Sequence, residues 1–211
     1  SEFRSQQRQI SNRKKLQQRA WTHLQPQTDG AVIAGPFSGL KLLESTVSPQ
    51  KVLGTYELEL RPAFKFVQTQ PFECIIDVGA AEGFYVVGLA KLIPDVPVIA
   101  FEQERKLHAK IRSLAHRNGC EDRVSVRGVC QVSDLIAATS GKSRCLVLCD
   151  AEGAEEELLD PQRITALRDA TIIVEVHEHL RSGVSDCLVT RFDRSHRIEM
   201  IRSKPRDFAD F

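Results

Sequence analysis

IIDVGAAEGFYVVGLA, residues 75–90, joins two apolar runs through a turn that holds one aspartate and two glycines. The apolar run that ends near Asp77 and the one that starts at Phe84 predict a strand, a sharp turn and a helix. Gly79 lets the chain turn without a Cβ clash, and Gly83 lets the helix begin close to a ligand. The stretch therefore predicts the first strand–loop–helix unit of an α/β sheet, with a ligand at the loop.

The same alternation continues along the chain. Apolar runs of strand length cover 73–78, 97–101, 123–127, 145–149 and 171–177, and helical patterns separate them at 84–93, 104–118, 131–138 and 155–168. Strands separated by such helices predict βαβ units, and runs such as CLVLC at 145–149 suit strands buried on both faces. We therefore expect a doubly wound α/β fold, a mostly parallel sheet with helices on both faces. A helix at 184–192 and a strand at 196–201 are expected to follow.

The chain before this alternation has a different pattern, so we divide the protein into residues 1–66 and residues 67–211. The first part begins with a basic helical pattern at 5–24 and continues with Gly-Pro and Ser-Gly turn signals. A helix or tight turn is expected at Ser48-Pro49, running towards Leu60, and Pro62 and Pro71 are expected to bound a connector. The first part is thus a helical and mixed extension of the α/β core.

Composition limits the class of protein. The 211 residues are 42% hydrophobic, enough for one domain with a sizeable core. No apolar run reaches the roughly 20 residues that cross a bilayer. The six cysteines show neither a C-x-x-C pair nor a zinc-type spacing. We therefore expect a cytoplasmic protein with no membrane partner.

The charge is uneven although the formal net charge is only +1. Residues 1–30 hold six basic and two acidic side chains. A basic amphipathic segment can bind RNA or an acidic partner, but such charge runs are more often solvated faces. The sequence leaves a nucleic-acid partner open and does not favour it.

The glycine loop differs from a dinucleotide-binding loop. A G-x-G-x-x-G fingerprint aims backbone amides at a pyrophosphate, whereas here Ala81 replaces the middle glycine and Asp77 ends the strand. Together with Glu82, Asp77 would repel a diphosphate and attract a ligand that carries an ammonium and a sulfonium. S-Adenosylmethionine (SAM) is such a ligand. We therefore predict a SAM cofactor on the loop residues Asp77, Gly79, Ala80, Ala81, Glu82, Gly83 and Phe84.

The second strand is expected to end at a further acidic residue. Glu102 follows the glycine loop by about twenty residues, where an acid accepts hydrogen bonds from both ribose hydroxyls of an adenosine ligand. The alternative is a surface glutamate at a strand end. With the ribose role, Gln103 would lie near the adenine, and Val129 and Cys130 would line its other face.

Acidic residues also follow the fourth predicted strand, in CDAEGAEEELLDP, residues 149–161. Asp150 and Glu152 fall where the transferred methyl group should lie, and they could anchor the methionine amino group or position an acceptor. Glu155 and Glu156 have a plain structural explanation, because the helix dipole favours acidic residues in a first helical turn. We therefore count Asp150 both as a cofactor contact and as a candidate catalytic residue.

The fifth predicted strand leads into TIIVEVHEHL, residues 171–180. Side chains alternate along a strand, so Glu175, His177 and His179 are expected to share one face. The pKa range of His177 suits it to remove a hydroxyl proton, and the candidate catalytic residues are His177, Asp150 and Glu175. A metal on the two histidines and Asp150 is less favoured, because no spacing is diagnostic, and we predict none. In the structural alternative the histidines are partly exposed and Glu175 bonds to nearby backbone.

The stretch from about 35 to 200 resembles FkbM-type SAM-dependent methyltransferases of the class I fold. The motifs that carry this resemblance are GPFSGLKLL, KVLGTYELEL, IIDVGAAEGFYVVGLA, CDAEGAEEELLDP and IIVEVHEH. DAEGAE resembles the family signature D-x-E-G-A-E and is the most specific of them. The resemblance implies cofactor contacts at Asp77, Gly79, Gly83 and Glu102, with Tyr56 and Glu57 closing over the cofactor. It implies an acceptor site near Asp150, Glu152 and His177.

Relatives of this type mostly methylate hydroxyl oxygens of sugars or polyketide-type metabolites, so we predict a small-molecule O-methyltransferase. The alternatives are an RNA methyltransferase that uses the basic helix at 5–24, and a non-catalytic relative that only binds the cofactor. An NAD-dependent oxidoreductase is least favoured, because Asp77 and Ala81 do not suit a pyrophosphate. The family core usually ends in an antiparallel hairpin, and this chain ends soon after the expected strand at 196–201. Either the core lacks its last strand here, or its sheet is shorter than usual.

Overall fold

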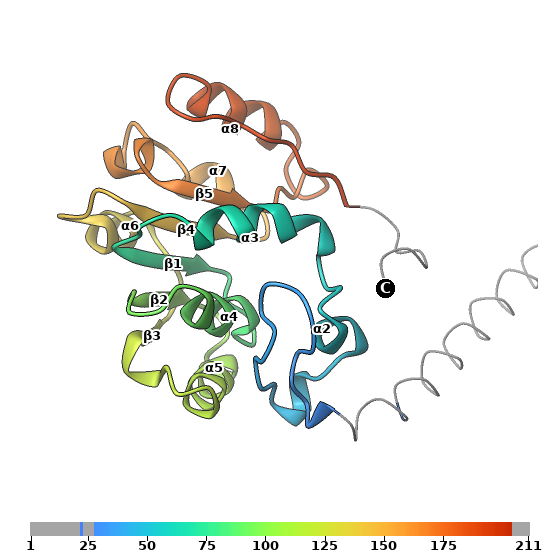
Figure 1. Cartoon of the computed structure of the whole chain (residues 1–211). Helices are drawn as coiled ribbons and strands as arrows, with labels where there is room; N and C mark the ends of the chain where they lie inside the picture. The colour runs from blue at the N-terminus through green and yellow to red at the C-terminus, as the bar shows by residue number, and fades with distance from the viewer. Residues whose placement is uncertain (1–21, 23–27, 204–211) are drawn as a thin grey trace, which may run out of the picture.

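A computed structural model describes the chain at Thr22 and at residues 28–203. Five strands form one parallel sheet: β1 Cys74–Val78, β2 Val98–Phe101, β3 Val124–Arg127, β4 Cys145–Cys149 and β5 Thr171–Val174. The strand order is β3-β2-β1-β4-β5, seen from bottom to top in Figure 1. The order reverses at β1, so the topological switch point lies at the carboxyl ends of β1 and β4. The sheet is Rossmann-like.

Helices cover both faces of this sheet. α4 Phe84–Leu92 and α5 Arg105–Arg117 pack on one face, and α6 Val132–Thr139, α7 Glu155–Leu158 and α8 Val184–Phe192 pack on the other. Neighbouring residues of β1 divide between the faces, since Ile75 joins the core with α4 and Ile76 joins the core with α6. Apolar side chains on both faces are typical of a central parallel strand. The predicted doubly wound α/β fold is therefore confirmed.

The segment before β1 packs on the same face as α4 and α5. It contains η1 Glu44–Thr46, α2 Pro49–Leu53, η2 Leu58–Leu60 and α3 Arg61–Gln68. Its side chains Phe37, Leu42 and Phe64 are buried in the core that α4 shares. The predicted start at Ser48-Pro49 is confirmed, because the Ser48 side chain accepts the Lys51 N–H and so caps α2. The helix stops at Gly54, with φ +68°, instead of running towards Leu60.

The connector predicted between Pro62 and Pro71 is wrong, because α3 occupies most of it. Proline is tolerated in the first turn of a helix, where its missing N–H would have no intrahelical partner. Phe64 and Val67 are buried against the core and fix one side of this helix. The division between residues 66 and 67 therefore falls inside α3.

The carboxy-terminal elements also differ from the pattern. The helix predicted at 155–168 is broken, because α7 ends at Leu158 and Pro161 separates it from the short helix η4 Thr165–Arg168. β5 ends at Val174, three residues early, and η3 Glu121–Arg123 precedes β3. No strand forms at 196–201, where the side chains of Ile198, Met200 and Ile201 are exposed and bury no apolar face.

The basic helix predicted at 5–24 lies outside the described residues, except for Thr22. Among the helices of the described part, none combines the length and the hydropathy that a membrane span requires.

Candidate functional site

The carboxyl ends of β1, β2 and β4 meet at the glycine loop. Gly79 and Ala80 donate their backbone N–H groups to the Phe101 carbonyl at 2.9 and 3.0 Å, and the Asp150 N–H donates to the Val78 carbonyl at 2.9 Å. Gly79 has φ +86°, and a Cβ there would lie 1.8 Å from the Asp150 carbonyl oxygen. Position 79 therefore admits only glycine, as the sequence predicts.

Asp77 is a buried carboxylate with one unpaired oxygen. The residue is 2% exposed. Among the buried polar side-chain atoms of the described residues, only Asp77 Oδ2 and Arg61 Nε lack a hydrogen-bond partner. Burial, followed by the charges of Asp150 and Glu102, raises the pKa of Asp77 to about 8. Because an unpaired buried carboxylate is costly, this position suits a ligand that brings a positive charge or a hydrogen-bond donor.

Glu102 lies at the end of β2 and ties the loop to the start of α5. Its Oε2 accepts the Ala81 N–H and its Oε1 accepts the Glu104 N–H, both at 2.7 Å. Each carboxylate oxygen can accept a further hydrogen bond, so Glu102 can still receive ribose hydroxyls in a fixed orientation. The alternative of a surface glutamate is wrong, because Glu102 is 6% exposed.

The other predicted adenine contacts lie near the surface. Gln103 and Val129 are exposed, and Cys130 is half-buried. Burial, followed by the charge of Asp134, raises the pKa of Cys130 to about 12, so its thiol is neutral. A neutral, half-buried thiol can line an apolar surface, and the adenine role of these three residues stays a prediction.

Glu82 does not add free negative charge to the loop, contrary to the prediction. Its Oε2 pairs with Lys51 Nζ at 3.1 Å, and the Lys51 side chain is 12% exposed. The same Nζ lies 5.4 Å from the ring centroid of Tyr56 and 5.2 Å from that of Phe84. Because Lys51 matches the charge of Glu82, Asp77 is the acidic side chain of the loop that is left for a cationic ligand.

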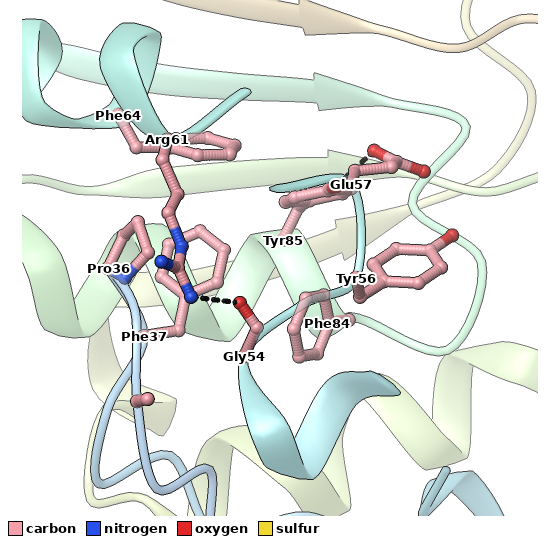
Figure 2. Close-up of a pocket in the computed structure, with 10 residues that line it drawn as sticks. Pro36, Phe37, Gly54, Tyr56, Glu57, Arg61, Phe64, Phe84 and Tyr85 are labelled. Atoms are coloured by element: carbon pink, nitrogen blue, oxygen red, sulfur yellow. Dashed lines mark hydrogen bonds between the residues drawn. The ribbon is translucent and has the colours of Figure 1, made fainter. Parts of the chain in front are cut away.

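Tyr56 and Glu57 lie beside the first residues of α4. The Tyr56 ring packs on edge against Phe84, with centroids 5.5 Å apart, and Glu57 accepts a hydrogen bond from the Tyr85 hydroxyl. Both residues line a pocket whose empty volume of about 310 Å³ includes space open to solvent, and Figure 2 shows the side chains that surround it. Arg61 lies on its other side and donates to the Gly54 carbonyl at 2.8 Å. Closure of Tyr56 and Glu57 over a cofactor stays a prediction.

Glu155 is a site residue that the sequence analysis missed. The favourable helix dipole alone would explain an acid at this position, but the contacts of its side chain show a further role. Its side chain is completely buried. Its two oxygens lie 3.1 and 3.0 Å from the Gly153 nitrogen, whose N–H they accept, and its Oε1 lies 2.7 Å from His177 Nδ1. Burial raises the pKa of Glu155, but these hydrogen bonds outweigh it and lower the pKa below its usual range. The final Glu of DAEGAE was the available signal.

His177, in the segment after β5, contacts two acidic residues of the segment after β4. Its Nδ1 faces Glu155, its Nε2 lies 3.5 Å from Asp150 Oδ1, and its side chain is 14% exposed. Burial lowers the pKa of His177, but the hydrogen bond to Glu155 and the surrounding carboxylates raise it overall. Burial, followed by the charge of Glu175, raises the pKa of Asp150 to about 6. Glu152 is exposed in the same loop, with φ +46°.

The three predicted catalytic residues lie together. Ligand atoms of Asp150, Glu175 and His177 are all within 4.8 Å of one another, so this group could hold a metal ion. His179 lies outside the group, and its ring packs on edge against His177, with centroids 5.7 Å apart. The prediction that Glu175, His177 and His179 share one face of a strand holds only in part. Glu175 and His177 do lie together, but β5 ends at Val174, so no strand alternation extends to His179.

No protein-family model and no curated protein matches the sequence. Solved structures to which the chain is similar include a methyltransferase from Podospora anserina bound to S-adenosylhomocysteine (SAH), with 14% identity, a TM-score of 0.48, and coverage of 71% of this chain and 72% of that chain. An O-methyltransferase from Bacillus cereus in complex with SAH has 21% identity and a TM-score of 0.45, with 72% and 70% covered. A precorrin-6y C5,15-methyltransferase from Geobacter metallireducens has 15% identity and a TM-score of 0.47, with 71% and 74% covered.

Likeness of this degree assigns no role to any residue. The fold of this chain is established by its own strand order, and its FkbM type stays a prediction from the motifs.

Proposed function

We propose that the protein is a SAM-dependent methyltransferase of the FkbM type that methylates a hydroxyl group of a small molecule. The observation that carries this proposal is the unpaired, buried Oδ2 of Asp77 at the switch point of the sheet. A pyrophosphate would bring neither a positive charge nor a hydrogen-bond donor to this oxygen. The ammonium of the methionine part of SAM would supply the missing donor and a compensating charge.

The residues around Asp77 fit the rest of this cofactor. Gly79 and Gly83, with φ +86° and +89°, keep the loop close to the strand ends without a Cβ in the way. Glu102 is held by two backbone N–H groups and retains acceptor capacity for the ribose hydroxyls. The proposed SAM site therefore extends from the end of β1 to the end of β2, and Asp150, directly after β4, borders it on the other side of β1.

When bound, SAM supplies a methyl group from its sulfonium, which becomes a neutral thioether as the acceptor oxygen gains the methyl group. The chain's own residues have to orient the acceptor and receive its hydroxyl proton. Asp150, Glu175 and His177 are adjacent at the ends of β4 and β5 and are the proposed proton-accepting group. Glu155 engages Nδ1 of His177, so that Nε2 points towards Asp150.

The small-molecule acceptor, a sugar or a secondary metabolite, follows from the motif resemblance. The RNA alternative depends on the basic helix predicted at 5–24, which lies outside the described residues except for Thr22. A non-catalytic relative would need the cofactor loop but not the adjacent Asp150, Glu175 and His177. This group is the reason that we favour an enzyme.

Calorimetric titration with SAM, S-adenosylhomocysteine (SAH) and NAD tests the proposal. We expect SAM and SAH to bind and NAD not to bind. Asp77→Asn should weaken SAM by about 10- to 100-fold, because it removes a charge-assisted hydrogen bond while keeping the shape. Asp169→Asn is the matched control. Asp169 is exposed and precedes β5, so it lies at the amino-terminal end of the strands, away from the carboxyl ends where Asp77 lies. Binding of NAD alone, or no effect of Asp77→Asn on SAM, would contradict the proposal.

A further inference from the structure

Two carboxylates and one imidazole converge at the ends of β4 and β5. The ligand atoms of Asp150, Glu175 and His177 lie within 4.8 Å of one another, and His177 Nε2 lies 3.5 Å from Asp150 Oδ1. Ligands that bind one cation at about 2.1 Å lie roughly 3 to 4 Å apart. Asp150 and Glu175 are exposed side chains, so small rotations of these two residues would complete the set.

The imidazole is already fixed in the orientation that a metal ligand needs. His177 Nδ1 lies 2.7 Å from Oε1 of Glu155, whose side chain is completely buried and is itself held by the Gly153 N–H. A histidine that binds a metal through one nitrogen usually donates its other N–H to a carboxylate, which fixes the tautomer and the ring. Glu155 supplies that carboxylate, and Nε2 is left for the cation.

The charge at this point favours a cation as well. In the described part of the chain, no lysine or arginine forms an ion pair with Asp150 or Glu175. Lys51 is paired with Glu82, and Arg181 is paired with Glu156. In the proposed function the charge of SAM is matched by Asp77, one strand away. The two carboxylates beside His177 therefore still lack a full counter-charge.

We propose that Asp150, Glu175 and His177 bind one divalent transition cation, such as Mn²⁺ or Zn²⁺, next to the cofactor. A mixed set of two carboxylates and one imidazole suits these ions better than Mg²⁺ or Ca²⁺, which prefer oxygen ligands only. The role of the cation, but not its binding, rests on the proposed function. It would hold the acceptor oxygen and ease loss of the hydroxyl proton to solvent, so His177 serves as a ligand when the cation is bound.

Titration of the full chain with Mn²⁺ tests this site, with the electron paramagnetic resonance signal of free Mn²⁺ as the readout. We expect one site, from which Zn²⁺ displaces Mn²⁺. Asp150→Asn, Glu175→Gln and His177→Gln should each weaken Mn²⁺ by at least about tenfold. Glu155→Gln should weaken it by about 10- to 100-fold without removing any ligand. His179→Gln is the matched control and should leave the affinity unchanged.

Absence of Mn²⁺ and Zn²⁺ binding, or binding that is equal in Glu175→Gln and the unaltered protein, would overturn the inference. Circular dichroism of each variant identifies any that fails to fold, and Glu175→Gln, at an exposed position, is expected to fold. SAM calorimetry in a chelator separates the two proposals. SAM binding without Mn²⁺ binding rejects only the metal site, whereas Mn²⁺ binding without SAM binding rejects the proposed cofactor.

Discussion

Asp77 shows how one side chain can couple ligand binding to protons. Burial holds the pKa of this carboxyl at about 8, so near neutral pH it is largely protonated in the free protein. An ammonium at Oδ2 favours the ionised form and lowers that pKa. We therefore expect SAM binding near neutral pH to release close to one proton. Calorimetry in buffers of different ionisation enthalpy measures this number, and Asp77→Asn should abolish most of the release. A release that Asp77→Asn leaves unchanged would mean that another group titrates.

The same carboxyl should make the free protein less stable as the pH rises. The pKa of Asp77 is 3.8 as an ordinary carboxyl and about 8 in the folded protein. Between these values the folded state binds more protons than the unfolded state, so the free energy of unfolding falls with rising pH. At the upper end of this window, Asp77→Asn should be more stable than the unaltered protein by about 2 to 5 kcal/mol. Urea denaturation at both ends of the window tests this, and a difference between the proteins that does not change with pH would contradict it.

At the scale of an element, the loop after β1 depends on close backbone approach. Gly79 and Gly119 both have positive φ, but a Cβ at Gly79 would lie 1.8 Å from the Asp150 carbonyl oxygen, and a Cβ at Gly119 would meet nothing within 4 Å. Gly119→Ala should therefore cost only the left-handed backbone, about 1 to 2 kcal/mol. Gly79→Ala should cost at least about 3 kcal/mol, because β1 and β4 must separate. Chemical denaturation compares the two, and equal costs would show that the loop relaxes freely.

At the scale of the whole molecule, the segment before β1 and the α/β core should unfold together. Phe37 is 6% exposed, and its ring centroid lies 4.9 Å from that of Phe64 and 5.5 Å from that of Phe84. Phe37→Ala should therefore destabilise the entire domain by about 3 to 5 kcal/mol and keep one cooperative transition. Phe66, in the same segment but 55% exposed, is the control, and its alanine variant should change stability by no more than about 0.5 kcal/mol.

Differential scanning calorimetry checks this prediction, with the calorimetric enthalpy compared with the van't Hoff enthalpy. Two separate transitions in Phe37→Ala would mean that the segment is an independent unit.

The sequence by itself determined the alternation of strands and helices from β1 to β5, the glycine loop and the strand ends where Asp77, Glu102 and Asp150 lie. Hydrophobic periods and turn residues encode these features within a few neighbouring residues. The same local signals gave wrong predictions at two places in the chain. The sequence predicts a boundary at Pro62, but this proline lies in the first turn of α3. It also predicts a strand alternation through Glu175, His177 and His179, but β5 ends at Val174.

Only the tertiary structure decided which charges are paired. Lys51 matches Glu82 across 31 positions of the sequence, and Glu155 holds His177 across 22. These pairs form because packing brings α2 to the glycine loop and α7 to the end of β5, and no local pattern records a contact between distant segments. Burial likewise distinguishes Glu155 from Glu156, although both follow the same turn. The physical reason is that the charge and pKa of a side chain depend on its solvent and its partners, and both are set by the packed fold.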